Sequence, residues 1–133
     1  SELLAMEARP GSMKHNVPDS PESRLIGGNI QDNKDKAINA SPVTWVTSQC
    51  RPMLIYHGTD DSKVIVEQSE TLHRLLLKAG ASNIYLIKVE GGTHGVRHET
   101  LTERMALFFE KILLENESIH MDESTLKINL LMN

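Results

Sequence analysis

The chain has 133 residues, the size of one domain, and its formal net charge of −4 argues against nucleic acid or an anionic membrane as a partner. No apolar run is long enough to cross a membrane, no secretory signal is visible, and the single cysteine, Cys50, excludes an internal disulfide. No motif implies a metal or an organic cofactor. We therefore expect a globular domain of the cytoplasm, unless a leader precedes Ser1.

The first third of the chain is predicted to contain turns and short helices. Residues 1–20 are expected to be irregular, because they are rich in polar and turn-forming residues. Ser20 before a proline is a typical helix start, and Gly27 is expected to end that helix. A second short helix is predicted over residues 32–40, and it should end before Pro42.

Strands and helices alternate in the middle of the chain. Residues 53–56 and 84–89 are compact apolar runs that predict two buried strands. Residues 67–79 carry apolar side chains at helical spacing before Gly80, and residues 97–116 carry a second apolar stripe of this kind. The order strand, helix, strand, helix is typical of an α/β fold with parallel strands and crossover helices.

The last segment, residues 117–133, differs from the rest. In it, Leu126, Ile128 and Leu130 alternate with polar residues, which favours a strand.

Two loops that follow the predicted strands carry polar side chains. Residues 57–64 include the carboxylates Asp60 and Asp61, and residues 90–96 include His94 between glycines. Neighbouring parallel strands lie about 4.8 Å apart, so side chains at their carboxyl ends can form hydrogen bonds with each other. A carboxylate and an imidazole in contact are the orienting half of a nucleophilic triad.

At these loops the chain resembles the α/β-hydrolases. Residues 57–64 are similar to their acid loop, His-Gly-Thr-x-Asp-x-x-Val, and residues 91–95 are similar to their histidine loop, Gly-x-x-His-Gly. Residues 21–28 and 40–44 resemble the preceding segments of bacterial carboxylesterases and acetyl-esterase-like proteins. The peptidases of the prolyl-oligopeptidase type share both loops. The resemblance extends over roughly residues 18–111.

The resemblance implies roles for Asp61 and His94. Asp61 would be the triad acid, because the acid is the later of the two positions in this loop, and His94 would be the triad base. The family order of nucleophile, acid and histidine puts the serine upstream. The 133 residues contain no Gly-x-Ser-x-Gly and no His-Gly-Gly oxyanion segment. We therefore expect residues 1–116 to be the C-terminal portion of an α/β-hydrolase domain, and residues 117–133 an extra tail.

The intact parent is expected to hydrolyse small carboxylic esters, and this chain alone is expected to be inactive or nearly so. A fragment of a peptidase related to prolyl oligopeptidase is one alternative. Another is a non-catalytic module that self-associates, or binds a partner, through the sheet edge that the absent half would leave open. Residues 124–133 could add a strand to that edge. A gene product without a selected function is the third alternative.

Several polar residues also have simpler interpretations. Asp61 could cap the helix that follows it or close a turn. His57 is expected to be structural, buried and hydrogen-bonded. The other four histidines are expected at the surface; they are His15, His73, His98 and His120.

Overall fold

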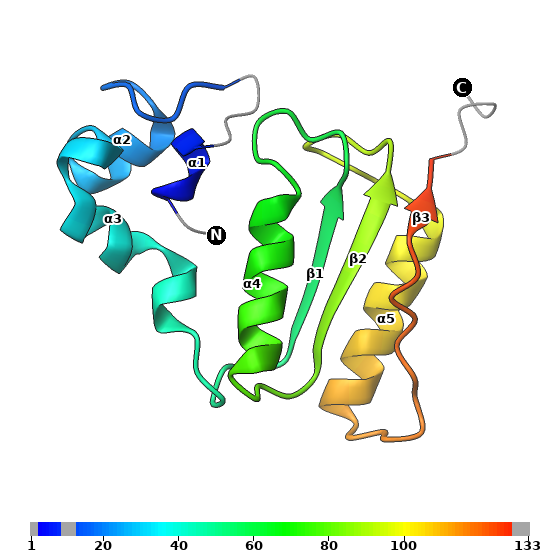
Figure 1. The fold of residues 1–133 in the computed structure, drawn as a ribbon. Helices are drawn as coiled ribbons and strands as arrows, with labels where there is room; N and C mark the ends of the chain where they lie inside the picture. Colours follow the sequence, from blue (N-terminus) through cyan, green and yellow to red (C-terminus); the bar gives the residue numbers. More distant parts are fainter. Residues whose placement is uncertain (1–2, 9–12, 129–133) are drawn as a thin grey trace.

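The computed structural model describes residues 3–8 and 13–128, which form an α/β fold. Three parallel strands form one sheet in the order β1 (Met53–Gly58), β2 (Ile84–Glu90) and β3 (Leu126–Lys127) (Figure 1). Strand β1 (Met53–Gly58) leads through helix α4 (Glu67–Lys78) to strand β2 (Ile84–Glu90), and helix α5 (Glu99–Leu113) follows. The predicted alternation of strands and helices is confirmed.

The two helices cover opposite faces of the sheet, because alternate side chains of a strand point to opposite faces. The cluster under α4 contains Met53, Ile55, Leu72, Leu76 and Ile84. The cluster under α5 contains Leu54, Ile87, Val89, Leu101 and Met105. Both strands therefore bury side chains on two faces, which explains why they appear in the sequence as continuous apolar runs.

The register of the sheet decides where the two polar loops lie. Met53 pairs with Ile84 at one end of the strands, and Gly58 pairs with Val89 at the other. The loops after β1 and β2 therefore begin side by side at the same edge. Strand β1 continues two residues beyond the predicted strand, so His57 and Gly58 belong to the strand rather than to the loop.

The N-terminal third forms short helices that lie beside α4 (Figure 1). They are α1 (Ala5–Ala8), α2 (Pro21–Ile26), the 3-10 turn η1 (Ile30–Asp32), α3 (Lys34–Ala40) and the 3-10 turn η2 (Pro42–Trp45). Ser20 caps α2 and Gly27 ends it with φ of 80°, both as predicted. The expectation that residues 1–20 are irregular is wrong at α1, where one helical turn packs Met6 into the N-terminal apolar cluster.

Helix α5 is shorter than the predicted helix over residues 97–116. His98 caps its start, because the imidazole Nδ1 accepts a hydrogen bond from the Thr100 N–H at 3.2 Å. The His98 Nε2–H donates to Lys127 O at 3.0 Å, so the same side chain also contacts the tail.

The tail forms a strand, β3 (Leu126–Lys127), which pairs with the end of β2. The buried Arg104 of α5 holds the tail: it donates to Ser124 O at 2.6 Å and to Ser124 Oγ at 3.0 Å, and it pairs with Asp122 at 3.1 Å. Leu130, the last position of the predicted alternation, lies outside the described residues. Because β3 pairs with β2, no described strand pairs with the outer edge of β1.

Across the residues that the structure describes, no helix is both long and apolar enough to span a membrane. Within those same residues, no three side chains of His, Cys, Asp or Glu lie close enough together to hold a metal ion.

Candidate active site

Two glycines allow the acid loop and the histidine loop to touch. A Cβ atom on Gly58 would lie 2.2 Å from the carbonyl oxygen of Gly92, and a Cβ atom on Gly92 would lie 3.1 Å from Gly58 Cα. Across this contact, Asp60 N–H donates to Gly92 O at 2.8 Å, and Thr59 N–H donates to Val89 O at 3.0 Å. The two loops therefore form one unit, and larger side chains at either glycine would push them apart.

This unit brings together the two residues that the sequence singled out. Asp61 Oδ2 lies 2.9 Å from His94 Nδ1, which is a hydrogen bond between carboxylate and imidazole. Asp60, the neighbouring carboxylate, is exposed and accepts a hydrogen bond from Thr59 Oγ1 instead. The geometry thus favours Asp61 over Asp60 as the partner of the histidine. The catalytic roles of Asp61 and His94 stay predictions.

Asp61 is a buried carboxylate, with 4% of its side chain exposed. Its other oxygen, Oδ1, accepts hydrogen bonds from the N–H groups of Lys63 and Val64, each at 2.9 Å. Burial by itself would raise the pKa of the Asp61 carboxyl. The hydrogen bonds from Val64, His94 and Lys63 outweigh burial and hold this pKa below its usual value of 3.8. Asp61 is therefore an anion at neutral pH.

The two ring nitrogens of His94 have different surroundings. Its Nδ1 faces an ionised carboxylate, so Nδ1 carries the proton in the neutral imidazole and Nε2 has a free lone pair. The side chain is 53% exposed, and Nε2 has no hydrogen-bond partner in the part of the chain that the structure describes. This nitrogen can accept a proton from an incoming hydroxyl group.

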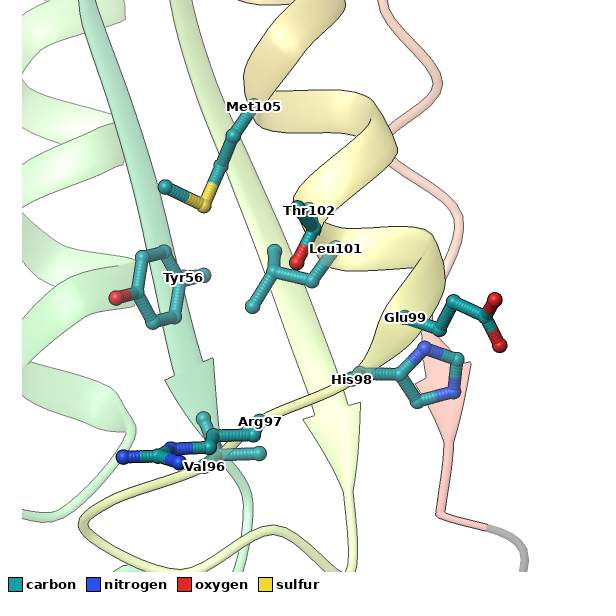
Figure 2. A pocket seen from close by; sticks show the side chains of 8 residues that line it. All are labelled: Tyr56, Val96, Arg97, His98, Glu99, Leu101, Thr102 and Met105. Atoms are coloured by element: carbon teal, nitrogen blue, oxygen red, sulfur yellow. The ribbon is translucent and has the colours of Figure 1, made fainter.

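A small cavity of about 220 Å³ lies beside the pair, between the end of β1 and the histidine loop. The residues that line it are Tyr56, His57, Gly58, Asp61, Val64, His94 and Val96. A second cavity of about 410 Å³ shares Tyr56 and Val96 with the first and continues along the start of α5 (Figure 2). Figure 2 shows Leu101 and Met105 of α5 on the side of this cavity opposite Tyr56. The two cavities adjoin at Tyr56 and Val96, so the site is open on the face of β1 that carries Tyr56.

Within residues 3–8 and 13–128, no serine, threonine or cysteine side chain is hydrogen-bonded to His94. Cys50 lies before the start of β1, at the opposite end of the sheet from Asp61 and His94. Among the described residues, the carboxylate and imidazole pair thus has no hydroxyl or thiol group hydrogen-bonded to its imidazole, and the sequence has no Gly-x-Ser-x-Gly motif.

Two further histidines contact the acid loop. His57 was expected to be structural, and its largely buried side chain has Nε2 at 2.7 Å from Val64 O and Nδ1 at 2.6 Å from Ser69 Oγ. His15 was expected at the surface, and this is wrong: it is 2% exposed, with Nε2 at 3.0 Å from Lys63 O. No local pattern around His15 indicated this contact, because the N-terminal segment reaches the loop only through tertiary folding.

Comparison with known proteins gives one family. No curated protein matches the chain. The BD-FAE family model matches residues 1–76, which are more than half of the chain. The matched region contains Asp61 and its loop, and His94 lies beyond it, in the loop that follows β2. On this match, supported by the parallel α/β fold, the chain belongs to the BD-FAE family, an esterase-like domain of the α/β-hydrolase superfamily.

Proposed function

We propose that this chain supplies the acid and the base of a serine hydrolase that cleaves small carboxylic esters. Asp61 is the acid, His94 is the base, and the serine comes from residues outside these 133. The observation that carries the proposal is the 2.9 Å hydrogen bond from His94 Nδ1 to a buried carboxylate, with Nε2 left exposed. The BD-FAE match supports an ester as the substrate.

In this reaction Nε2 of His94 takes the proton of the serine hydroxyl as the serine oxygen attacks the ester carbonyl. Asp61 stays ionised and stabilises the imidazolium that forms. The imidazolium then gives its proton to the departing alkoxide, which leaves an acyl-enzyme. In the second half, His94 takes a proton from water, the resulting hydroxide attacks the acyl carbonyl, and the proton returns to the serine.

The position of Nε2 limits where the serine can lie. Its oxygen must come within about 2.6–3.2 Å of this nitrogen. The cavity beside Asp61 and His94 opens over β1, and the outer edge of β1 has no partner strand among the described residues. A segment that carries the nucleophile can therefore pack along β1 and reach His94 without displacing a described element.

The proposal is tested by supplying the missing group. The chain is mixed with the Gly-x-Ser-x-Gly segment of a BD-FAE protein, and turnover of a short-chain acyl ester is measured. Each component alone is expected to be inactive, and the mixture is expected to hydrolyse the ester. His94→Ala in this chain, or Ser→Ala in the other segment, should remove that activity, with a loss of at least about 10³-fold.

Two outcomes would overturn the proposal. One is a mixture that forms a stable complex and still hydrolyses no ester. The other is robust turnover by this chain alone that His94→Ala abolishes, because a nucleophile would then lie within the 133 residues. A peptide amide assayed in parallel separates esterase from peptidase activity, since prolyl-oligopeptidase-type enzymes share both loops.

A second candidate function is a non-catalytic module that associates through β1. Tyr56 is 44% exposed on a strand whose outer edge is unpaired among the described residues, and such a surface favours association. Esterase activity in the reconstituted mixture would set this candidate aside. Its own test is the oligomeric state of the isolated chain in solution.

A further inference from the structure

The backbone next to Asp61 is held by hydrogen bonds on both sides. The N–H groups of Lys63 and Val64 both donate to Asp61 Oδ1, at 2.9 Å each. The carbonyl groups of the same two residues both accept from a histidine: Lys63 O lies 3.0 Å from His15 Nε2, and Val64 O lies 2.7 Å from His57 Nε2. The carboxylate and the two histidines therefore bind consecutive residues of one loop from opposite sides.

We infer that His15 and His57 are positioning residues that fix the loop around Asp61 so that its carboxylate stays aligned with His94. The inference rests on the proposed function of the Asp61–His94 pair and goes beyond it, because neither histidine touches the reacting atoms. His57 is at the end of β1 and His15 is in the N-terminal segment, so two distant parts of the chain control the geometry of one loop.

The contacts of His57 fix which of its nitrogens carries the proton. The partner of Nε2 is a carbonyl oxygen, which can only accept, so Nε2 is the donor. On the other side, Ser69 Oγ lies 2.6 Å from Nδ1 and can donate its hydroxyl hydrogen to it. Asp61 Oδ2 also lies 3.2 Å from Nε2.

The contact of His15 reaches Asp61 through a single peptide group. The Lys63 carbonyl and the Val64 N–H belong to the same peptide unit, so His15 donates to one end of that unit and Asp61 accepts from the other. Hydrogen bonds in such a chain polarise one another and become stronger. On the other side of the ring, Glu22 Oε1 lies 3.2 Å from the Nδ1 of His15.

Loss of either histidine would leave a loop carbonyl without its donor. A carbonyl that loses its donor must find a new one in water, so the loop would move toward water and carry Asp61 with it. The hydrogen bond between Asp61 and His94 would weaken first, since it depends on the orientation of a side chain that the loop positions.

Matched variants test this in the full 133-residue chain. His15→Met and His57→Met keep most of the volume and remove the donor, while His15→Gln and His57→Gln place an amide N–H near the position of Nε2. The readout is the ¹⁵N NMR spectrum of His94 with neutral imidazole, which reports the ratio of the two tautomers. We expect Nδ1–H to predominate in the wild type, each Met variant to lower that ratio about tenfold, and the Gln variants to restore most of it.

Asp61→Asn separates failure of this inference from failure of the proposed function. If Nδ1–H does not predominate in the wild type, or Asp61→Asn leaves the ratio unchanged, the Asp61–His94 pair itself is refuted. If Asp61→Asn collapses the ratio and both Met variants leave it unchanged, the inference about His15 and His57 is wrong and the proposed pair stands.

Variants of the supporting residues cover the case in which a Met variant does not fold. Ser69→Ala removes the hydrogen-bond partner of His57 Nδ1, and Glu22→Ala removes the carboxylate that lies beside His15 Nδ1, while both imidazoles stay in the chain. A smaller shift of the His94 ratio in the same direction is expected from each. A ratio that stays at the wild-type value in both folded variants would overturn the inference.

Discussion

Asp61 is a residue at which two physical effects compete. Burial disfavours its charge, and three hydrogen bonds, from Val64, His94 and Lys63, favour it. The hydrogen bonds prevail, so the pKa of this carboxyl is lower in the folded chain than in the unfolded chain. As the pH falls, the unfolded chain therefore binds this proton first. The stabilisation by Asp61 is fully present above 3.8 and is lost as the pH falls through the lower folded value.

Asp61→Asn should make this contribution visible. At pH 7 we expect the free energy of unfolding to fall by about 1–3 kcal/mol, because a buried anion with charge-assisted hydrogen bonds is replaced by an amide. The difference between wild type and variant should shrink as the pH is lowered past 3.8. Urea unfolding, followed by circular dichroism at a series of pH values, measures both effects.

Asp60→Asn is the matched control, since this carboxylate is adjacent and exposed. It should change stability by less than about 0.5 kcal/mol at any pH. Equal pH dependence in the two variants would show that the hydrogen bonds around Asp61 do not hold its carboxyl in the charged form.

At the scale of secondary-structure elements, the site depends on the close approach of two loops at the ends of β1 and β2. That approach has no room for a side chain at Gly58, because a Cβ atom there would lie 2.2 Å from Gly92 O. The strand register brings the loops to the same edge, and the small residue decides how near they come.

Gly58→Ala should therefore separate the acid from the base. We expect a loss of about 1–3 kcal/mol in unfolding free energy, as for other overpacked positions, and a weakened Asp61–His94 hydrogen bond. Thermal unfolding and the His94 ¹⁵N spectrum measure the two effects. Gly95→Ala in the same loop is the control, since no atom lies within 4 Å of the added Cβ. If both variants behave alike, steric contact between the loops does not hold the site together.

The tail is a second feature at this scale, and it is attached to α5 chiefly through Arg104. Arg104→Met keeps an apolar stem and removes the hydrogen bonds to Ser124 O and Ser124 Oγ. We expect the free energy of unfolding to fall by about 1–3 kcal/mol, because the tail loses two hydrogen bonds from a charged donor. Backbone amides near β3 should also exchange faster with solvent.

Arg97→Met is the control for the tail, because Arg97 is exposed and makes no ion pair with the residues that the structure describes. Hydrogen exchange should be unchanged near β3 in this variant. Unchanged exchange in Arg104→Met as well would mean that strand pairing with β2 alone holds the tail.

At the scale of the whole molecule, the outer edge of β1 has no partner strand among the described residues and is available for pairing. The tail pairs with the end of β2, and β1 is an edge strand on the other side of the described sheet. Tyr56 is exposed on it, beside the cavity that Figure 2 shows. We predict that the isolated chain self-associates weakly through this strand, because an unpaired edge with an exposed aromatic side chain is a template for pairing.

Tyr56→Lys should reduce this association several-fold, since a lysine on an edge strand carries a charge that disfavours pairing. Sedimentation velocity over a range of chain concentrations measures the effect. Leu25→Lys is the control, because Leu25 is exposed on α2, away from the sheet. A chain that stays monomeric at all concentrations, or a Leu25 variant that dissociates equally, would contradict the prediction.

The sequence determined the parts of this protein that depend on local patterns. Apolar periodicity predicted β1, α4, β2 and α5, because the period of buried positions follows directly from strand and helix geometry. The order of these elements predicted parallel strands, and this placed Asp61 and His94 at one edge. The short helix α1 and the ends of α5 were missed or misplaced, since caps and packing rather than periodicity decide them.

Only the tertiary structure decided which contacts support the site. It placed His15 against Lys63 across 48 positions of the chain, and it set the 2.9 Å contact between His94 and Asp61, the carboxylate that the loop pattern had already favoured. It also put the tail on β2 and left β1 open. None of these features follows from neighbouring residues, because each depends on which distant segments can pack together at the same time.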